Sequence, residues 1–181
     1  AWMRSGKNFA IGTDRLGDLS ALMSLGSQMS FQLEVIDPKL EGKTIISSTQ
    51  IRNSLVKGEI KEANKLMGRH FMLPGKVIHG ESRGTKIGFP TANLEIAPER
   101  LIPGNGVYVT RAWLSDTDAM AVTNIGVRPT FENALLEARV EPHLLDTEGN
   151  LYDSEMTLEF LDFIRPEKKF AGAKDLIRQI N

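Results

Sequence analysis

The sequence has no cysteine, and only 2 of its 181 residues are tryptophan. Without cysteine the chain can form no disulfide, no thiolate nucleophile and no thiolate metal site. The absence of disulfides fits a reducing compartment. The chain also lacks the apolar run of a signal peptide and the roughly eighteen consecutive apolar residues that a membrane span needs. These absences predict a cytoplasmic protein with no membrane partner.

An excess of charge of one sign is also missing, because the formal net charge is only −1. Proteins that bind nucleic acid by releasing counterions normally carry a clustered basic face, and those that bind single strands need aromatic platforms. Only 7% of this chain is aromatic. We therefore expect no nucleic-acid partner, and a composition of 41% hydrophobic and 25% charged residues predicts a folded globular protein.

Two common nucleotide motifs are absent, since no Gly-x-x-x-x-Gly-Lys-Ser/Thr occurs and no Gly-x-Gly-x-x-Gly follows a strand-like run. Instead, glycines at positions 75, 80, 84 and 88 lead into Phe89-Pro90-Thr91-Ala92-Asn93. Glycines let a backbone approach a phosphate closely. Thr91 and Asn93 share one face of an extended backbone and offer the hard oxygen ligands that Mg²⁺ prefers. The stretch predicts a phosphate-and-magnesium site, although both side chains could instead cap a turn.

The first part of the chain contains both helical and strand-like patterns. Helical spacing with Asp18 as N-cap and Gly68 as C-cap, and two short strand patterns, predict elements at Gly17–Ser30, Phe31–Ile36, Thr44–Ile46 and Glu59–Met67. Composition then shifts towards strands near Arg69. We therefore expect one domain at residues 1–68 and a second at residues 69–181.

Hydroxyl side chains lie between the predicted strand at Thr44–Ile46 and a further helical pattern. Ser47, Ser48 and Thr49 precede the apolar spacing that continues beyond Arg52. A strand, a Ser/Thr turn and a helix N-terminus together make an anion-binding geometry. The same hydroxyls could simply cap the helix.

The second domain reads as consecutive strands without intervening helices. Six β-branched or alternating runs occur at Phe71–Ile78, Ala92–Ile96, Gly106–Leu114, Ala119–Val127, Leu136–Leu145 and Glu155–Ile164. Such a series indicates an antiparallel barrel or sandwich. Apolar residues on one face of Ala171–Ile180 predict a final helix that covers the barrel.

Glu141 interrupts an otherwise apolar strand pattern. A carboxylate on an inward face is costly to bury without a task or a partner, so Glu141 is a candidate general base. Arg139 and His143 alternate onto the same face and could orient it, or all three could face solvent. Pro142 cannot donate to a ladder, which predicts an edge strand or a position without a partner.

Two weaker signals complete the set of candidate residues. The segment from Thr123 to Phe131, which includes Asn124, ends a strand in a turn rich in hydrogen-bonding groups and could line a nucleotide pocket. His70 and His79 show no metal-ligand spacing, and we interpret both as surface or packing residues.

In this order the segments resemble the bacterial bifunctional riboflavin kinase/FMN adenylyltransferase, also called FAD synthetase. The likeness to its kinase domain extends from Arg69 to the C-terminus. It rests on five motifs, which are Gly88-Phe89-Pro90-Thr91-Ala92-Asn93, Gly106-Val107-Tyr108, Asn124-Ile125-Gly126-Val127-Arg128-Pro129-Thr130-Phe131, Val140-Glu141 with His143-Leu144-Leu145-Asp146, and Leu151-Tyr152. The chain departs from the family pattern at Pro142, where a ladder donor is usual, and at Asp153, where a glycine commonly follows the Leu-Tyr pair.

The resemblance implies a mainly β fold, a six-stranded antiparallel Greek-key barrel with a C-terminal helix, preceded by a partial Rossmann-like α/β segment. It implies that Glu141 deprotonates the ribityl 5′-hydroxyl of riboflavin and that Thr91 and Asn93 hold Mg²⁺ with ATP. The other nucleotide-binding residues implied are Gly80, Arg83, Gly84, Lys86, Gly88 and Asn124. The flavin-binding residues implied are Arg165, Lys168 and Phe170.

Residues 1–68 resemble the end of the family's adenylyltransferase domain, where Ile46-Ser47-Ser48-Thr49-Gln50-Ile51-Arg52 matches a motif that grips a nucleotide triphosphate. By resemblance, Ser47, Ser48, Thr49 and Arg52 are remnants of that site. The family's His-x-Gly-His motif is absent, so we expect no FMN adenylylation by this chain alone. The partial domain could instead serve as a docking surface for self-association.

The resemblance and the candidate residues favour an enzyme, a riboflavin kinase with ATP and riboflavin as substrates, FMN as product and Mg²⁺ as cofactor. The alternative is a non-catalytic flavin- or nucleotide-binding module derived from the kinase. Such a module would keep the glycine loop and lose turnover.

Overall fold

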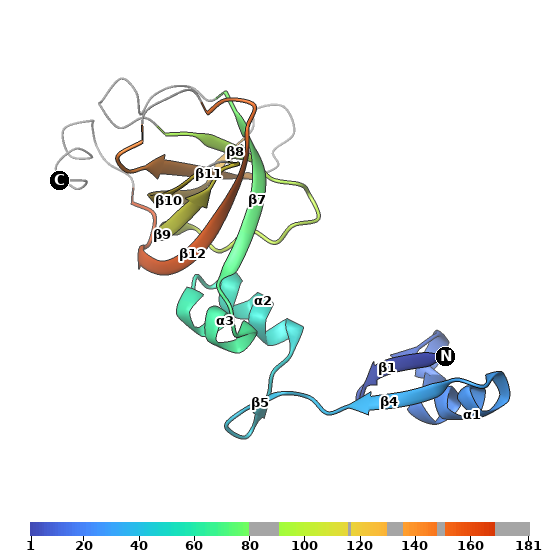
Figure 1. Cartoon of the computed structure of the whole chain (residues 1–181). Helices are drawn as coiled ribbons and strands as arrows, with labels where there is room; N and C mark the ends of the chain where they lie inside the picture. The colour runs from blue at the N-terminus through green and yellow to red at the C-terminus, as the bar shows by residue number, and fades with distance from the viewer. Residues whose placement is uncertain (80–90, 116, 130–135, 148–150, 169–181) are drawn as a thin grey trace. The chain divides into compact units, whose positions relative to one another are not determined.

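The structure is a computed structural model that describes residues 1–79, 91–115, 117–129, 136–147 and 151–168 (Figure 1). The chain divides into two compact units, Ala1–Ser47 and Ser48–Asn181. The first unit is a small α/β body, and the second is mainly β. Among the described residues, no helix has the length and apolar character needed to cross a membrane.

The first unit is a β-α-β arrangement in which β1 and β4 pair in parallel and α1 connects them. Asp18 caps α1, because its carboxylate accepts hydrogen bonds from the backbone N–H groups of Ser20 and Ala21. This confirms the predicted helix and its N-cap. The elements are β1 (Trp2–Gly6), β2 (Ala10–Ile11), the 3₁₀ turn η1 (Thr13–Arg15), β3 (Gly17–Asp18), α1 (Leu19–Met29), β4 (Gln32–Ile36), β5 (Leu40–Glu41) and β6 (Thr44–Ile45).

The second unit is a closed barrel preceded by two helices (Figure 1). Its elements are α2 (Ser48–Val56), α3 (Ile60–Met67), β7 (Phe71–Ile78), β8 (Asn93–Glu95), β9 (Gly106–Trp113), β10 (Asp118–Pro129), β11 (Leu136–Leu144) and β12 (Glu155–Arg165). The six strands close in the order β10-β11-β8-β7-β12-β9, and every pairing is antiparallel. Because β9, β10 and β11 are consecutive neighbours and β12 returns to lie beside β9, the topology is a Greek key. The predicted fold class is confirmed.

Strand alternation places the core inside the barrel. On β7, Leu73 and Val77 are buried while Met72 and Ile78 are exposed, and on β10 the alternate residues Ala121, Thr123 and Ile125 are buried. Inward strand residues and buried residues of α2 and α3 form one apolar cluster, which comprises Leu55, Ile60, Ala63, Leu73, Val77, Ala92, Leu94, Tyr108, Ala112, Ala121, Ile125, Val140, Leu144, Met156, Leu158 and Phe160. The predicted helix at Ala171–Ile180 lies outside the described residues.

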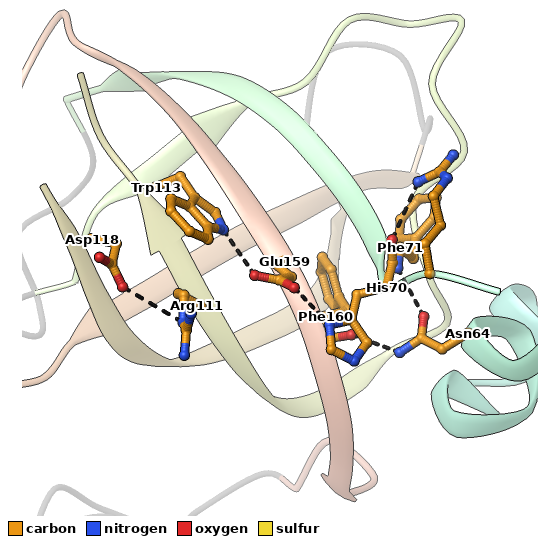
Figure 2. Close-up of polar contacts among 9 residues, drawn as sticks. Asn64, His70, Phe71, Arg111, Trp113, Asp118, Glu159 and Phe160 are labelled. Atoms are coloured by element: carbon orange, nitrogen blue, oxygen red, sulfur yellow. Dashed lines mark hydrogen bonds and ion pairs between the residues drawn. The ribbon is translucent and has the colours of Figure 1, made fainter. Parts of the chain in front are cut away.

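Helix α3 is fastened to the barrel by the buried side chain of Asn64 (Figure 2). Its Nδ2 donates to the carbonyl of Phe160 at 2.9 Å, and its Oδ1 accepts from the N–H of Phe71 at 2.8 Å. The register of β12 against β9 shifts just after Phe160, so the carbonyl that accepts from Asn64 lies at a β-bulge. On the exposed side of the same helix, Lys61 forms an ion pair with Asp162 at 2.8 Å.

A second polar cluster lies on the outer face of the barrel, next to the start of β7 (Figure 2). His70 Nδ1 and Glu159 Oε1 lie 2.6 Å apart, and Trp113 Nε1 donates to the other carboxylate oxygen at 2.9 Å. The hydrogen bond with His70, helped by the one from Trp113, lowers the pKa of Glu159. Arg111 pairs with Asp118 at 3.5 Å beside this cluster. His70 is therefore a surface packing residue, as predicted.

The turn before β9 is packed tightly against the end of α2. Gly104 N–H donates to the carbonyl of Leu55 at 2.9 Å, and a Cβ at Gly104 would collide with the carbonyl of Val56. The hydroxyl of Tyr108 donates to the carbonyl of Gly104 from inside the barrel, and burial raises the pKa of this phenol to about 12. The turn, the helix end and the barrel core thus form one packed region.

The boundary between the two compact units lies earlier in the chain than the shift in composition. Composition predicted a boundary near Arg69, whereas the compact unit that holds the barrel begins at Ser48. The reason is that Leu55, Ile60 and Ala63 belong to the barrel's own apolar cluster. Helices α2 and α3, expected with the first 68 residues, therefore pack with the barrel.

Candidate active site

Glu141 faces outward from the barrel, not inward. Its neighbours on β11, Val140 and Pro142, are buried, and the strand alternates, so Glu141 and His143 point to the outer face. The carboxylate is still half-buried, with 30% of its side chain exposed. The premise of an inward carboxylate was wrong, and the outward alternative holds with partial shielding.

Strand register sets an asparagine on each side of Glu141. On one side, β10 pairs Asn124 directly with Glu141. On the other side, Val140 pairs with Leu94 of β8, so the antiparallel register brings Asn93 opposite Glu141. Directly opposed residues share a face of the sheet. We call Asn93, Glu141 and Asn124 the polar row.

A backbone hydrogen bond supports this register beyond the Val140–Leu94 pair. Ala92 N–H donates to the carbonyl of Pro142 at 2.9 Å, one pair further along. Ala92 is buried, while Thr91 and Asn93 on either side of it are half-buried. Both side chains therefore lie on the outer face, beside Glu141. The structure brings the predicted metal ligands and the predicted base together.

Pro142 does not mark an edge strand, which corrects one of the two predicted explanations. Strand β11 lies between β10 and β8 in a closed barrel. The carbonyl of Pro142 points to β8, where it accepts from Ala92. Since hydrogen-bonded and non-hydrogen-bonded pairs alternate along an antiparallel ladder, the pair of Pro142 with Thr123 on the β10 side needs no N–H from the proline. The missing donor therefore falls on the β8 side.

One charged group of β11, Arg139, lies beside the polar row. Arg139 Nη1 lies 3.9 Å from Glu141 Oε1, with 40% of its side chain exposed. An ion pair of this length and exposure contributes at most about 1 kcal/mol to stability. Arg139 therefore supplies a positive potential near the carboxylate and leaves it accessible.

The segment after β12 lies over the same outer face. Arg165 ends β12 and pairs with Val107 of β9, which in turn pairs with Asn124. Glu167 extends across β10, because a Cβ at Gly126 would lie 2.6 Å from its Oε1. The predicted flavin-binding residues Arg165 and Lys168 therefore belong to a segment that adjoins the polar row.

The family model described as flavokinase, riboflavin kinase, matches residues 67–181, which is more than half of the chain. The chain belongs to the riboflavin kinase family. The matched region contains the whole barrel and the complete polar row.

Longer riboflavin kinase relatives match nearly the whole chain. The bifunctional riboflavin kinase/FMN adenylyltransferase of Pseudomonas fluorescens is 37% identical over 177 residues, covering 97% of this chain and 56% of the relative. The Escherichia coli K12 protein of the same name is 35% identical, covering 97% of this chain and 55% of the relative. This chain thus spans about half the length of the curated relatives it matches.

A solved structure shares the fold over nearly the whole chain. The crystal structure titled macrolide-efflux protein from Streptococcus pneumoniae has a TM-score of 0.83 and 31% identity. The match covers 97% of this chain and 56% of that chain.

The position at which the riboflavin kinase pattern commonly has glycine is strained in this chain. Asp153 has a positive φ of 65°, a left-handed conformation that glycine adopts without cost. Its N–H donates to the carbonyl of Val77 at 2.9 Å, and its carboxylate lies 2.9 Å from Lys76 Nζ. The hydrogen bond from Lys76 lowers the pKa of Asp153. Nearby, His79 stacks on Tyr152 with ring centroids 3.7 Å apart, which confirms its packing role.

Several predicted site residues are not part of the polar row. Ser48, Thr49 and Arg52 lie on α2, and Ser47 ends the first unit. The glycine-loop residues Gly80, Arg83, Gly84, Lys86 and Gly88, and the flavin candidate Phe170, lie outside the described residues. The close approach of Glu167 to Gly126 was not predicted from the sequence. The glycine inside a predicted strand was a signal that another group could approach the backbone there.

Proposed function

We propose that this chain catalyses the magnesium-dependent transfer of a phosphoryl group from ATP to riboflavin, giving FMN and ADP. Membership of the riboflavin kinase family supports the reaction class. The observation that carries the proposal is the strand register that sets one carboxylate, Glu141, on the same outer face as Thr91 and Asn93, the two candidate oxygen ligands. Phosphoryl transfer asks mainly for positioning, charge neutralisation and a base, and this arrangement offers all three.

The donor set fits magnesium. Thr91 offers a hydroxyl and Asn93 an amide carbonyl, and both are half-buried on one outer face. Mg²⁺ takes hard oxygen ligands, keeps several waters and completes its shell with substrate phosphates. When bound, the ion neutralises charge on the phosphates of ATP. By resemblance, the glycine segment from Gly80 to Gly88 covers those phosphates.

Glu141 serves as the general base. Its carboxylate accepts the proton of the ribityl 5′-hydroxyl while that oxygen forms a bond to the γ-phosphorus of ATP. The bond between the γ-phosphorus and the bridging oxygen breaks, and ADP leaves with that oxygen. A general base contributes about 10²–10⁴-fold to the rate, or roughly 3–5 kcal/mol of barrier.

The flavin lies beside the segment that follows β12. Arg165 and Lys168 provide positive charge there, and Arg165 is connected through Val107 to Asn124 by strand pairing. Phe170 follows in the chain and, by resemblance, contacts the flavin ring. This arrangement directs the ribityl chain towards Glu141.

Incubation with riboflavin, ATP and Mg²⁺, followed by chromatography that separates FMN from FAD, tests the proposal. We expect FMN from the parent, and a loss of turnover of about 10²-fold or more in Glu141→Gln with nucleotide binding retained. Glu155→Gln, which removes an exposed carboxylate of β12, is the matched control and should behave like the parent. Binding of flavin or ATP without any FMN would support the non-catalytic module instead.

A further inference from the structure

We propose that Asn124 positions the carboxylate of Glu141 for proton transfer, and does not serve mainly as a nucleotide ligand. The inference rests on the proposed function and assigns a role within the same site. It replaces the role that the resemblance implied for Asn124.

The register places the two side chains within reach of one another. Asn124 and Glu141 are direct partners on β10 and β11. The carbonyl of Pro142 points to the β8 side. Because backbone hydrogen bonds alternate along the ladder, the backbone groups of Asn124 and Glu141 face each other across β10 and β11. Cβ atoms of opposed residues lie about 4.5–5.5 Å apart, a span that an amide and a carboxylate can bridge. The Asn124 amide can therefore donate to one oxygen of Glu141.

The backbones that carry these two side chains are fixed from within the barrel. Thr123 and Ile125, on either side of Asn124, are fully buried, and Val140 beside Glu141 is 1% exposed. The Thr123 hydroxyl lies 2.7 Å from the hydroxyl of Thr110, which ties β10 to β9. Two anchored backbones keep these side chains opposite one another, so Asn124 can orient the carboxylate of Glu141.

The two asparagines of the polar row stand in different surroundings. Asn93 is two residues from Thr91 and shares its face, which suits oxygen coordination of a cation. Asn124 lies across Glu141 from that pair, on β10. An amide N–H that engages one carboxylate oxygen fixes the direction in which the carboxylate accepts a proton. A neutral donor also orients the base without adding a full positive charge beside it.

Steady-state kinetics of three variants test this role. Asn124→Ala and Asn124→Leu both remove the amide, and leucine keeps the branched shape of the side chain, whereas Asn124→Gln keeps an amide donor on a longer side chain. We expect kcat to fall about 10–50-fold in the alanine and leucine variants and less in the glutamine variant. KM for ATP should stay within about 2-fold of the parent in all three.

Val122→Ala is the matched control, since Val122 is the preceding outward residue of β10 and pairs with His143. It should leave kcat and both KM values near those of the parent. A rise of KM for ATP by about 10-fold at unchanged kcat would overturn the inference and restore a nucleotide ligand. Activity that follows side-chain volume, with leucine above glutamine, would also overturn it. A parent that makes no FMN refutes the proposed function itself, a result measured before any variant.

Discussion

Replacing Asn64 by alanine should destabilise the second unit far more than its small change in volume suggests. Asn64 is buried and makes two hydrogen bonds, to the carbonyl of Phe160 and from the N–H of Phe71. Alanine at this position leaves both backbone groups without their partner. Lys61→Ala is the natural comparison, because Lys61 lies on the same helix and contacts the same strand through Asp162.

The magnitude follows from the burial of the two contacts. A neutral hydrogen bond contributes about 1 kcal/mol net, and an unsatisfied buried group costs about 1–3 kcal/mol. Alanine recovers roughly 0.5 kcal/mol through its higher helix propensity. Asn64→Ala should therefore lower the free energy of unfolding by about 2–4 kcal/mol. The Lys61–Asp162 pair leaves the side chains 75% and 41% exposed. Its loss should cost less than about 1 kcal/mol.

Urea unfolding followed by tryptophan fluorescence measures the difference. The chain has two tryptophans, Trp2 in the first unit and Trp113 in the second. A Trp2→Phe background leaves Trp113 as the sole reporter, and circular dichroism checks that both variants retain their strands. Losses for Asn64→Ala and Lys61→Ala that agree within about 0.5 kcal/mol would refute the claim that burial governs this contact.

Three further outcomes are expected. Thr91→Ala should raise the Mg²⁺ concentration needed for half-maximal turnover, and an unchanged Mg²⁺ titration would remove Thr91 from the metal site. Asp153→Gly should be more stable than Asp153→Ala by about 1 kcal/mol, because both lose the Lys76 ion pair and only alanine keeps a Cβ at positive φ; equal stabilities would contradict the strain. The lowered pKa of Glu159 means that its ionised form stabilises the fold above the ordinary pKa of 4.5, and that this stability is lost as the pH falls through the lowered value. Acid titration of unfolding should therefore be flatter for Glu159→Gln than for the parent, and parallel curves would refute this contribution.

Local signals predicted most of the elements. Strand β7 was expected at Phe71–Ile78 and occupies that range, because the segment is rich in apolar residues and follows the helix-ending Gly68. Asp18 and Gly68 were expected as helix caps, and both cap the helices beside them. These features depend on neighbours within a few residues, so sequence spacing alone contains the information.

The orientation of Glu141 depended on more distant contacts. Spacing showed that Arg139, Glu141 and His143 share a face, but not whether that face points inward. The buried Val140 and Leu144 were the available signal. The register that sets Asn93 and Asn124 beside Glu141 comes from closure of the barrel, which brings three strands together from separate parts of the chain.

The position of α2 and α3 was also beyond local reasoning. Asn64 has the pattern of an ordinary polar helix residue, yet it is buried against Phe160, which lies far along the chain. The prediction that Pro142 marks an edge strand was wrong because it, too, depended on distant strand pairing. A proline lacks one donor, and a central strand tolerates that loss where its partner strand is as short as β8.

The pairing of β12 with both β7 and β9 has a consequence for how the protein emerges from the ribosome. Five strands of the barrel are translated before the one that joins its two open sides, so the nascent sheet cannot close until residues up to Arg165 have been made. Until then β7 and β9 each expose an unpaired edge, which invites contact with other chains. Closure of the barrel therefore waits for β12, and mutation in β12 should show first as lost yield of protein rather than lost catalysis.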